Sequence, residues 1–133
     1  MEQMLAGLTR LRDSWPAPPW SWDNRFATIA ASFAIALEPE VRTSAMHAFP
    51  RGWTKSSLDT APQPFRDLAT STGLRARQRL LGGDELTAPQ LYGLWWPWGN
   101  GDTITLRIGI IDGDGNAEPM TSIRQLFGVV PQT

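Results

Sequence analysis

Residues 91–111 read LYGLWWPWGNGDTITLRIGII, and they carry the clearest structural pattern in the chain. Two runs rich in aromatic and β-branched residues, Leu91–Trp98 and Thr103–Ile111, flank the turn-forming sequence Gly99-Asn-Gly-Asp102. Such a pattern predicts an antiparallel β-hairpin. Because Pro97 cannot donate a backbone hydrogen bond, we expect a four-residue loop closed by the pair Trp98 and Thr103.

Side chains alternate along the hairpin, so the two faces can be separated. The face expected in the core carries Gly93, Trp95, Pro97, Ile104, Leu106, Ile108 and Ile110. The other face carries Tyr92, Leu94, Trp96, Trp98, Thr103, Thr105 and Arg107.

Trp, Tyr and Arg dominate the energy of many protein interfaces, because they bury a large area and keep a polar group. We therefore predict a partner-binding surface made of Tyr92, Trp96, Trp98 and Arg107, here called the aromatic group. The alternative is that the helices of the chain, or its segment Trp15–Trp22, cover this surface.

Outward from the hairpin, the N-terminal residues predict a helix over Glu2–Asp13, since Leu5, Leu8 and Leu11 recur at helical spacing. Prolines then end the helix. The segment Trp15–Trp22 is expected to be an extended arm whose indoles lie on another surface, that of its own domain included.

Residues 26–37 fit both the two-residue period of a strand and the 3.6-residue period of a helix. Large residues alternate with small ones from Ile29 to Leu37, which favours a strand, although part of the segment also fits a helix. Pro39 is suited to a first helical turn, and this helix should stop at Pro50-Arg-Gly52.

A further helix is predicted through Phe65, Leu68 and Ala69, ending near Gly73. Leu74–Leu81 fits a strand or a helix, and we favour a strand; Ser122–Phe127 is short and fits either. Together these elements predict the α+β class, with a mainly antiparallel sheet of about four strands covered by helices. The expected organisation is one domain over residues 1–133, with an N-terminal helix and Pro/Trp-rich arm over 1–22 and a body over 23–133.

Three arginines alternate in Leu74–Leu81. On a strand, Arg75, Arg77 and Arg79 would form a basic stripe on one face, which phosphate or nucleic acid could bind. The chain has a net charge of −1, however, and acidic residues follow from Asp102 onward. A solvated or internally paired stripe is therefore the favoured interpretation, and nucleic acid is not an expected partner.

The composition excludes several classes of chemistry. The chain has no cysteine and a single histidine, His47, so disulfides, thiolate sites and zinc centres with several imidazoles are excluded. Asp112-Gly-Asp-Gly-Asn116 begins like a calcium loop, but Ala117 and Ile123 stand where glycine and a bidentate glutamate are needed. We expect no metal and no cofactor.

Catalytic signatures are also missing. His47 could act as a general base, but no serine lies in a nucleophile-elbow motif. We therefore expect a protein that is not an enzyme. The most apolar run, residues 27–37, is too short for the roughly 20 residues of a membrane span, and the first residues do not resemble a signal peptide. A cytoplasmic location is expected, and eleven arginines to one lysine are typical of a GC-rich, bacterial genome.

These observations predict a small accessory protein, a non-catalytic protein-interaction module such as a chaperone, adaptor, inhibitor or assembly subunit. Its contact surface would be the aromatic group, and its partner another protein. The alternative is a small-ligand or carbohydrate-binding domain that uses the same tryptophans. Association with a second copy of the chain is left open.

Overall fold

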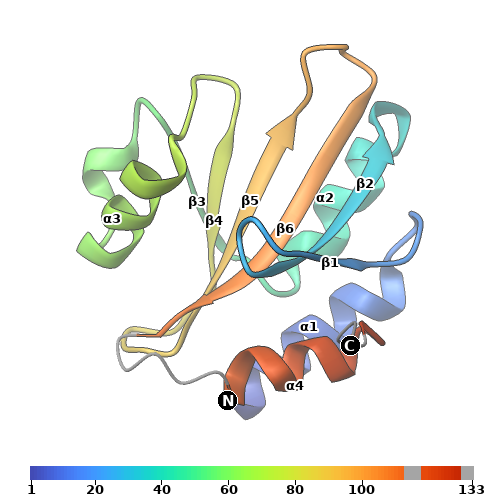
Figure 1. The fold of residues 1–133 in the computed structure, drawn as a ribbon, viewed down its shortest axis with the longest axis horizontal. Coiled ribbons are helices and arrows are strands. Elements are labelled where there is room, and N and C mark those ends of the chain that lie inside the picture. Colours follow the sequence, from blue (N-terminus) through green and yellow to red (C-terminus); the bar gives the residue numbers. More distant parts are fainter. Residues whose placement is uncertain (113–117, 130–133) are drawn as a thin grey trace.

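An antiparallel sheet of six strands organises the protein (Figure 1). The computed structural model describes residues 1–112 and 118–129, so residues 113–117 of the acidic loop and the tail from residue 130 lie outside the described residues. Across the sheet the strand order is β1-β2-β6-β5-β4-β3. The strands are β1 (Ser21–Asp23), β2 (Thr28–Ala34), β3 (Arg51–Thr54), β4 (Arg79–Gly82), β5 (Gln90–Pro97) and β6 (Thr103–Ile111).

The central hairpin is confirmed. Pro97 lies opposite Ile104 on β6, and the amide of Trp98 donates to the carbonyl of Thr103 at 2.9 Å. Hydrogen-bonded and non-bonded pairs alternate in antiparallel sheets. Pro97 therefore falls where no donor is needed, and the loop has the four residues expected.

Two strands and two boundaries differ from the prediction. The strand expected from Ile29 to Leu37 ends at Ala34, because Ile35–Leu37 forms a 3-10 turn. The sheet has six strands rather than about four, because β1 and β3 add an edge strand on each side. They have three and four residues, too few for an alternating pattern to be recognised. The strand expected over Leu74–Leu81 begins only at Arg79, because Arg75 and Gln78 form a turn with backbone and side-chain hydrogen bonds of 3.0 and 2.8 Å.

The helices agree well with the sequence. They are α1 (Glu2–Ser14), α2 (Glu38–Met46), α3 (Gln63–Thr72) and α4 (Glu118–Leu126), with short 3-10 turns at Ile35–Leu37 and Leu58–Thr60. Pro39 lies in the first turn of α2, and Gly73 ends α3 in the left-handed conformation with φ 75°. The open choice at Ser122–Phe127 resolves as a helix, since α4 includes most of it.

One face of the sheet is covered by α1, α2 and α4; we call it the helix-covered face. Leu8, Val41 and Ile123, one from each helix, are fully buried there against β2, β5 and β6. Helices α1 and α4 lie side by side in Figure 1. The arm also packs on this face, because Trp15 meets Phe33 at 5.8 Å between ring centroids. The indoles of the arm therefore lie on the arm's own domain.

The opposite face, here called the α3 face, is covered only in part. Helix α3 packs its Phe65 and Ala69 toward Leu80 on β4 and Leu94 on β5. Figure 1 shows α3 beside β3 and β4, at one end of the sheet. Over β2 the cover ends, and Ser32 and Ala34 are exposed.

Candidate functional site

The four residues of the aromatic group do project from the same face, the α3 face, but most of the group is covered. The exposed fractions are 6% for Tyr92, 9% for Trp96 and 8% for Arg107, against 47% for Trp98. The cover comes from α3 and from Phe26, in the loop between β1 and β2, and not from the tryptophan arm. Of the four predicted residues, Trp98 is therefore the one available for contact.

Arg107 sits at the centre of the covered part. Its guanidinium carbon lies 4.6 Å from the ring centroid of Trp96 and 4.9 Å from that of Phe26. Its Nε donates to Oδ2 of Asp23 at 2.7 Å, across a sequence separation of 84 residues. Arg107 Nη1 and Trp96 Nε1 are buried without a hydrogen-bond partner among the described residues. A single ion pair and two ring contacts thus hold this cation.

Burial and the ion pair shift the pKa values of Asp23 and Tyr92. Partial burial of Asp23 acts to raise its pKa, but the hydrogen bond and the charge of Arg107 outweigh this, so the pKa lies below its ordinary value. Burial, with a smaller effect from the negative charge of Asp23, raises the pKa of Tyr92 to about 12. Both shifts favour one charge state at neutral pH: Asp23 is ionised and Tyr92 is neutral.

Trp98 is held in place while part of its indole is exposed. Its Nε1 donates to Oγ1 of Thr105 at 2.7 Å, and Oγ1 of Thr105 lies 2.7 Å from Oγ of Ser32. This hydrogen-bond chain joins the end of β5 to β6 and β2, across the uncovered part of the α3 face. The indole is therefore fixed in one orientation beside small exposed residues.

The three arginines of the predicted basic stripe do not form one surface. Arg75 and Arg77 lie in the turn that precedes β4, while Arg79 is on the strand. Arg79 is paired with Trp95 across β4 and β5, so it projects from the helix-covered face. All three side chains are exposed, but the alternation that would align them is absent.

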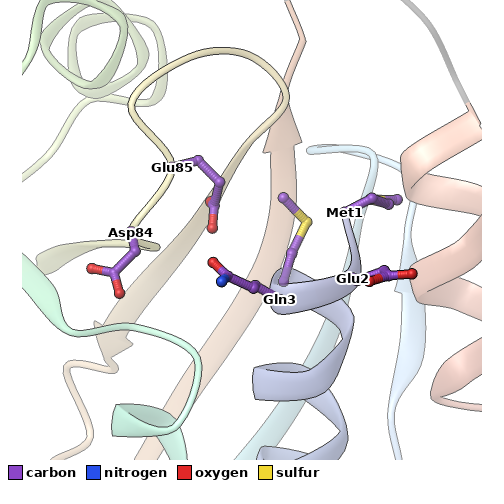
Figure 2. A pocket seen from close by; sticks show the side chains of 6 residues that line it. Met1, Glu2, Gln3, Asp84 and Glu85 are labelled. Carbon is purple, nitrogen blue, oxygen red and sulfur yellow. The ribbon is translucent and has the colours of Figure 1, made fainter.

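A pocket of about 320 Å³ lies between the first turn of α1 and the loop after β4 (Figure 2). Figure 2 shows Glu85 and Gln3 directed toward one another across it, with Asp84 and Glu2 on opposite sides. The Glu85 carboxylate accepts a hydrogen bond from the amide of Leu91 at 2.9 Å. This carboxylate holds the loop, and the exposed acidic residues around it define no ligand site.

The single histidine and the acidic residues are the remaining candidates for catalysis or metal binding. His47 is exposed at the C-terminal end of α2, where its backbone amide donates to the carbonyl oxygens of Ser44 and Ala45. Among the described residues no group of three or more His, Asp or Glu side chains could hold a metal ion. No described helix has the length and apolar character that crossing a membrane requires.

Sequence reasoning missed two residues that shape this region, Asp23 and Phe26. Asp23 ends β1 and Phe26 lies in the loop that follows, and the pairing of β1 with β2 and of β2 with β6 brings them to Arg107. A buried arginine on a central strand needs an acidic partner. That requirement was the available signal, although it does not say which carboxylate meets it.

The chain was also compared with protein-family models, with curated proteins and with solved structures, and none of the three comparisons gives a match.

Proposed function

We propose that this protein is a non-catalytic interaction module that binds a cytoplasmic protein partner through Trp98 and the uncovered part of the α3 face. The observation that carries the proposal is the half-exposed indole of Trp98, tied to Thr105 through its Nε1. An indole that is already ordered loses little conformational freedom on binding.

The size of the effect follows from the exposed area. Burying a tryptophan removes about 200 Å² from water, so an indole that is 47% exposed has about 100 Å² still to bury. At about 25 cal/mol per Å², a partner that covers it gains roughly 2 kcal/mol. This is the size of an interface hot spot.

The surroundings of Trp98 also suit a protein partner. Ser32 and Ala34 are small and exposed, and they lie on β2, which β6 separates from the end of β5 that carries Trp98. A flat surface of small residues next to one large aromatic side chain lets a partner approach closely around a single anchor. Tyr92, Trp96 and Arg107 lie on the same face but are buried beside this surface, so they are not part of it.

A carbohydrate or other small ligand is the alternative occupant of the same surface. A sugar would stack on the indole of Trp98, as it would on an aromatic platform. Trp96 and Tyr92, which would extend such a platform, are buried, so a sugar would have Trp98 alone of the three aromatic residues in the group. The protein partner is therefore the better supported occupant.

The test is capture of partners from the native cells with the tagged chain and with Trp98→Ala. Leu86→Ala is the matched control, because Leu86 is a large apolar residue that is 87% exposed in another loop. We expect one stoichiometric protein that Trp98→Ala loses and Leu86→Ala keeps. With purified components, Trp98→Ala should weaken binding roughly 30-fold.

If both variants capture the protein equally, the binding surface does not include Trp98. If no protein is captured, titration with a panel of sugars decides whether the alternative holds. Sedimentation of the purified chain identifies a second copy as the partner, since Trp98→Ala would then shift the equilibrium toward monomer. Circular dichroism of each variant checks that the fold is kept.

A further inference from the structure

A second surface, independent of Trp98, lies on the helix-covered face of the sheet. A pocket of about 180 Å³ opens there between α2 and β4. Phe49, Leu81 and Trp95 form its apolar floor, and Met46 forms one wall. Phe49 and Trp95 are buried, at 4% and 3% exposure, whereas Met46 is 68% exposed. The pocket therefore has a rigid base and an open side.

The pocket exists because the helix layer does not reach the outer strands. The helix α2 and the residues after it line the pocket with Arg42, Met46 and Phe49, spaced so that they fall on one side of the helical path. Gly93 on β5 lets Phe49 lie close to the sheet, because an added Cβ would meet Phe49 at 3.2 Å. The space between α2 and β4 therefore stays open and forms the pocket.

Two arginines lie at the rim of this pocket. Arg42 comes from α2, with its guanidinium carbon 5.9 Å from the ring centroid of Trp95, and Arg79 comes from β4, directly across from Trp95. Neither guanidinium group has a hydrogen-bond or ion-pair partner among the described residues, and no carboxylate lines the pocket. Arg107, by contrast, is neutralised by Asp23.

Two guanidinium groups above an apolar floor favour a particular class of ligand. A guanidinium presents a planar fork of donors that matches a carboxylate, and it binds well beside aromatic rings. Ligand sites typically combine an apolar floor with a few polar groups that fix orientation. A cavity of about 150 Å³ holds benzene, so this pocket has room for one ring or a short aliphatic chain.

We infer that the pocket binds a small organic carboxylate with an apolar body of about one ring. The ring lies on Phe49, Leu81 and Trp95, and the carboxylate faces outward between Arg42 and Arg79. The inference does not depend on the proposed protein partner, because Trp98 projects from the opposite face of the sheet.

Phenylacetate is a suitable probe, with phenylacetamide as the neutral molecule of the same shape. Titration followed by amide and indole NMR signals of the full chain should give 1:1 binding with a Kd of about 1 mM, as expected for about ten non-hydrogen atoms. The indole signal of Trp95 should shift. The amide should bind at least about tenfold more weakly, because it cannot pair with the two cations.

Arg42→Gln and Arg79→Gln each remove one charge and keep most of the side-chain length. Each should weaken phenylacetate binding about tenfold. Arg77→Gln is the matched control, because Arg77 is exposed and close in sequence but does not line the pocket. Its affinity should equal that of the unchanged chain.

Three results would overturn the inference. The first is no shift of the Trp95 indole with phenylacetate at concentrations well above the expected Kd. The second is equal affinity for phenylacetamide, which would remove the role of the charge. The third is an equal loss in Arg77→Gln and Arg79→Gln, which would indicate attraction by net charge alone. All substituted residues are exposed, so spectra of the free variants should remain those of the folded chain.

Discussion

Replacing Asp23 by asparagine tests the ion pair that holds the centre of the α3 face. The substitution keeps the shape of the side chain and leaves Arg107 charged, buried and held by the rings of Phe26 and Trp96. Breaking a buried pair in this way costs about 3–5 kcal/mol. The side chain of Asp23 is 18% exposed, so some solvent screening remains. We therefore expect the lower end, about 3 kcal/mol.

The assay is equilibrium unfolding in urea, followed by tryptophan fluorescence, together with a thermal melt. A loss of about 3 kcal/mol corresponds to a fall of about 10 °C in Tm for a chain of this length. Asp13→Asn is the control, because its ion pair with Arg12 is 3.0 Å long but has 42% and 64% exposed side chains. That variant should lose no more than about 0.5 kcal/mol.

A second variant distinguishes the ion pair from other effects of the substitution. Combining Asp23→Asn with Arg107→Met removes both charges, so it should recover part of the stability that Asp23→Asn loses. The lowered pKa of Asp23 has a related consequence. Its contribution is present above the unfolded pKa of about 3.9 and is lost as pH falls through the folded pKa. Equal losses for Asp23→Asn and Asp13→Asn would refute the reasoning.

Two further predictions follow from buried contacts. Tyr92 is the one tyrosine of the chain, so an absorbance titration should show ionisation near pH 12 instead of 10. Because its folded pKa is raised, stability should fall by about 2–3 kcal/mol as pH rises from 10 to 12, and ionisation near pH 10 in the folded chain would contradict this. Gly7→Ala should destabilise by about 2 kcal/mol despite alanine's better helix propensity, because the added Cβ would lie 2.7 Å from the carbonyl oxygen of His47. In the same urea assay Gly99→Ala, with nothing within 4 Å, should lose less than Gly7→Ala, and the reverse order would count against the close approach of α1 and α2.

Local patterns predicted the parts of the fold that local chemistry specifies. The β5–β6 hairpin follows from alternation around a turn sequence, and the end of α3 follows from Gly73. The edge strands β1 and β3 have three and four residues, too short for any period to be recognised. The strand β3 also depends on pairing with β4, which lies far from it in the sequence, and a local pattern does not contain that pairing.

The candidate site shows the same division between local and distant information. Alternation on β5 and β6 correctly placed Trp96, Trp98 and Arg107 on one face. Their exposure depends on Asp23, which reaches Arg107 from 84 positions away in the sequence, and on Phe26 in the loop after Asp23. Only the order of the strands brings that loop over Trp96, so the burial of the group was not predictable from the hairpin itself.

The short edge strands limit how this protein can associate. An exposed edge of a sheet can accept a strand from another chain by backbone hydrogen bonding, and short edges are one way in which proteins avoid this. Here β1 offers three residues and β3 offers four. Added strands would gain few backbone bonds at either edge. If the protein binds a partner as proposed, selectivity would then come from the side chains on the two faces, and a change of a few surface residues would alter the choice of partner without altering the sheet.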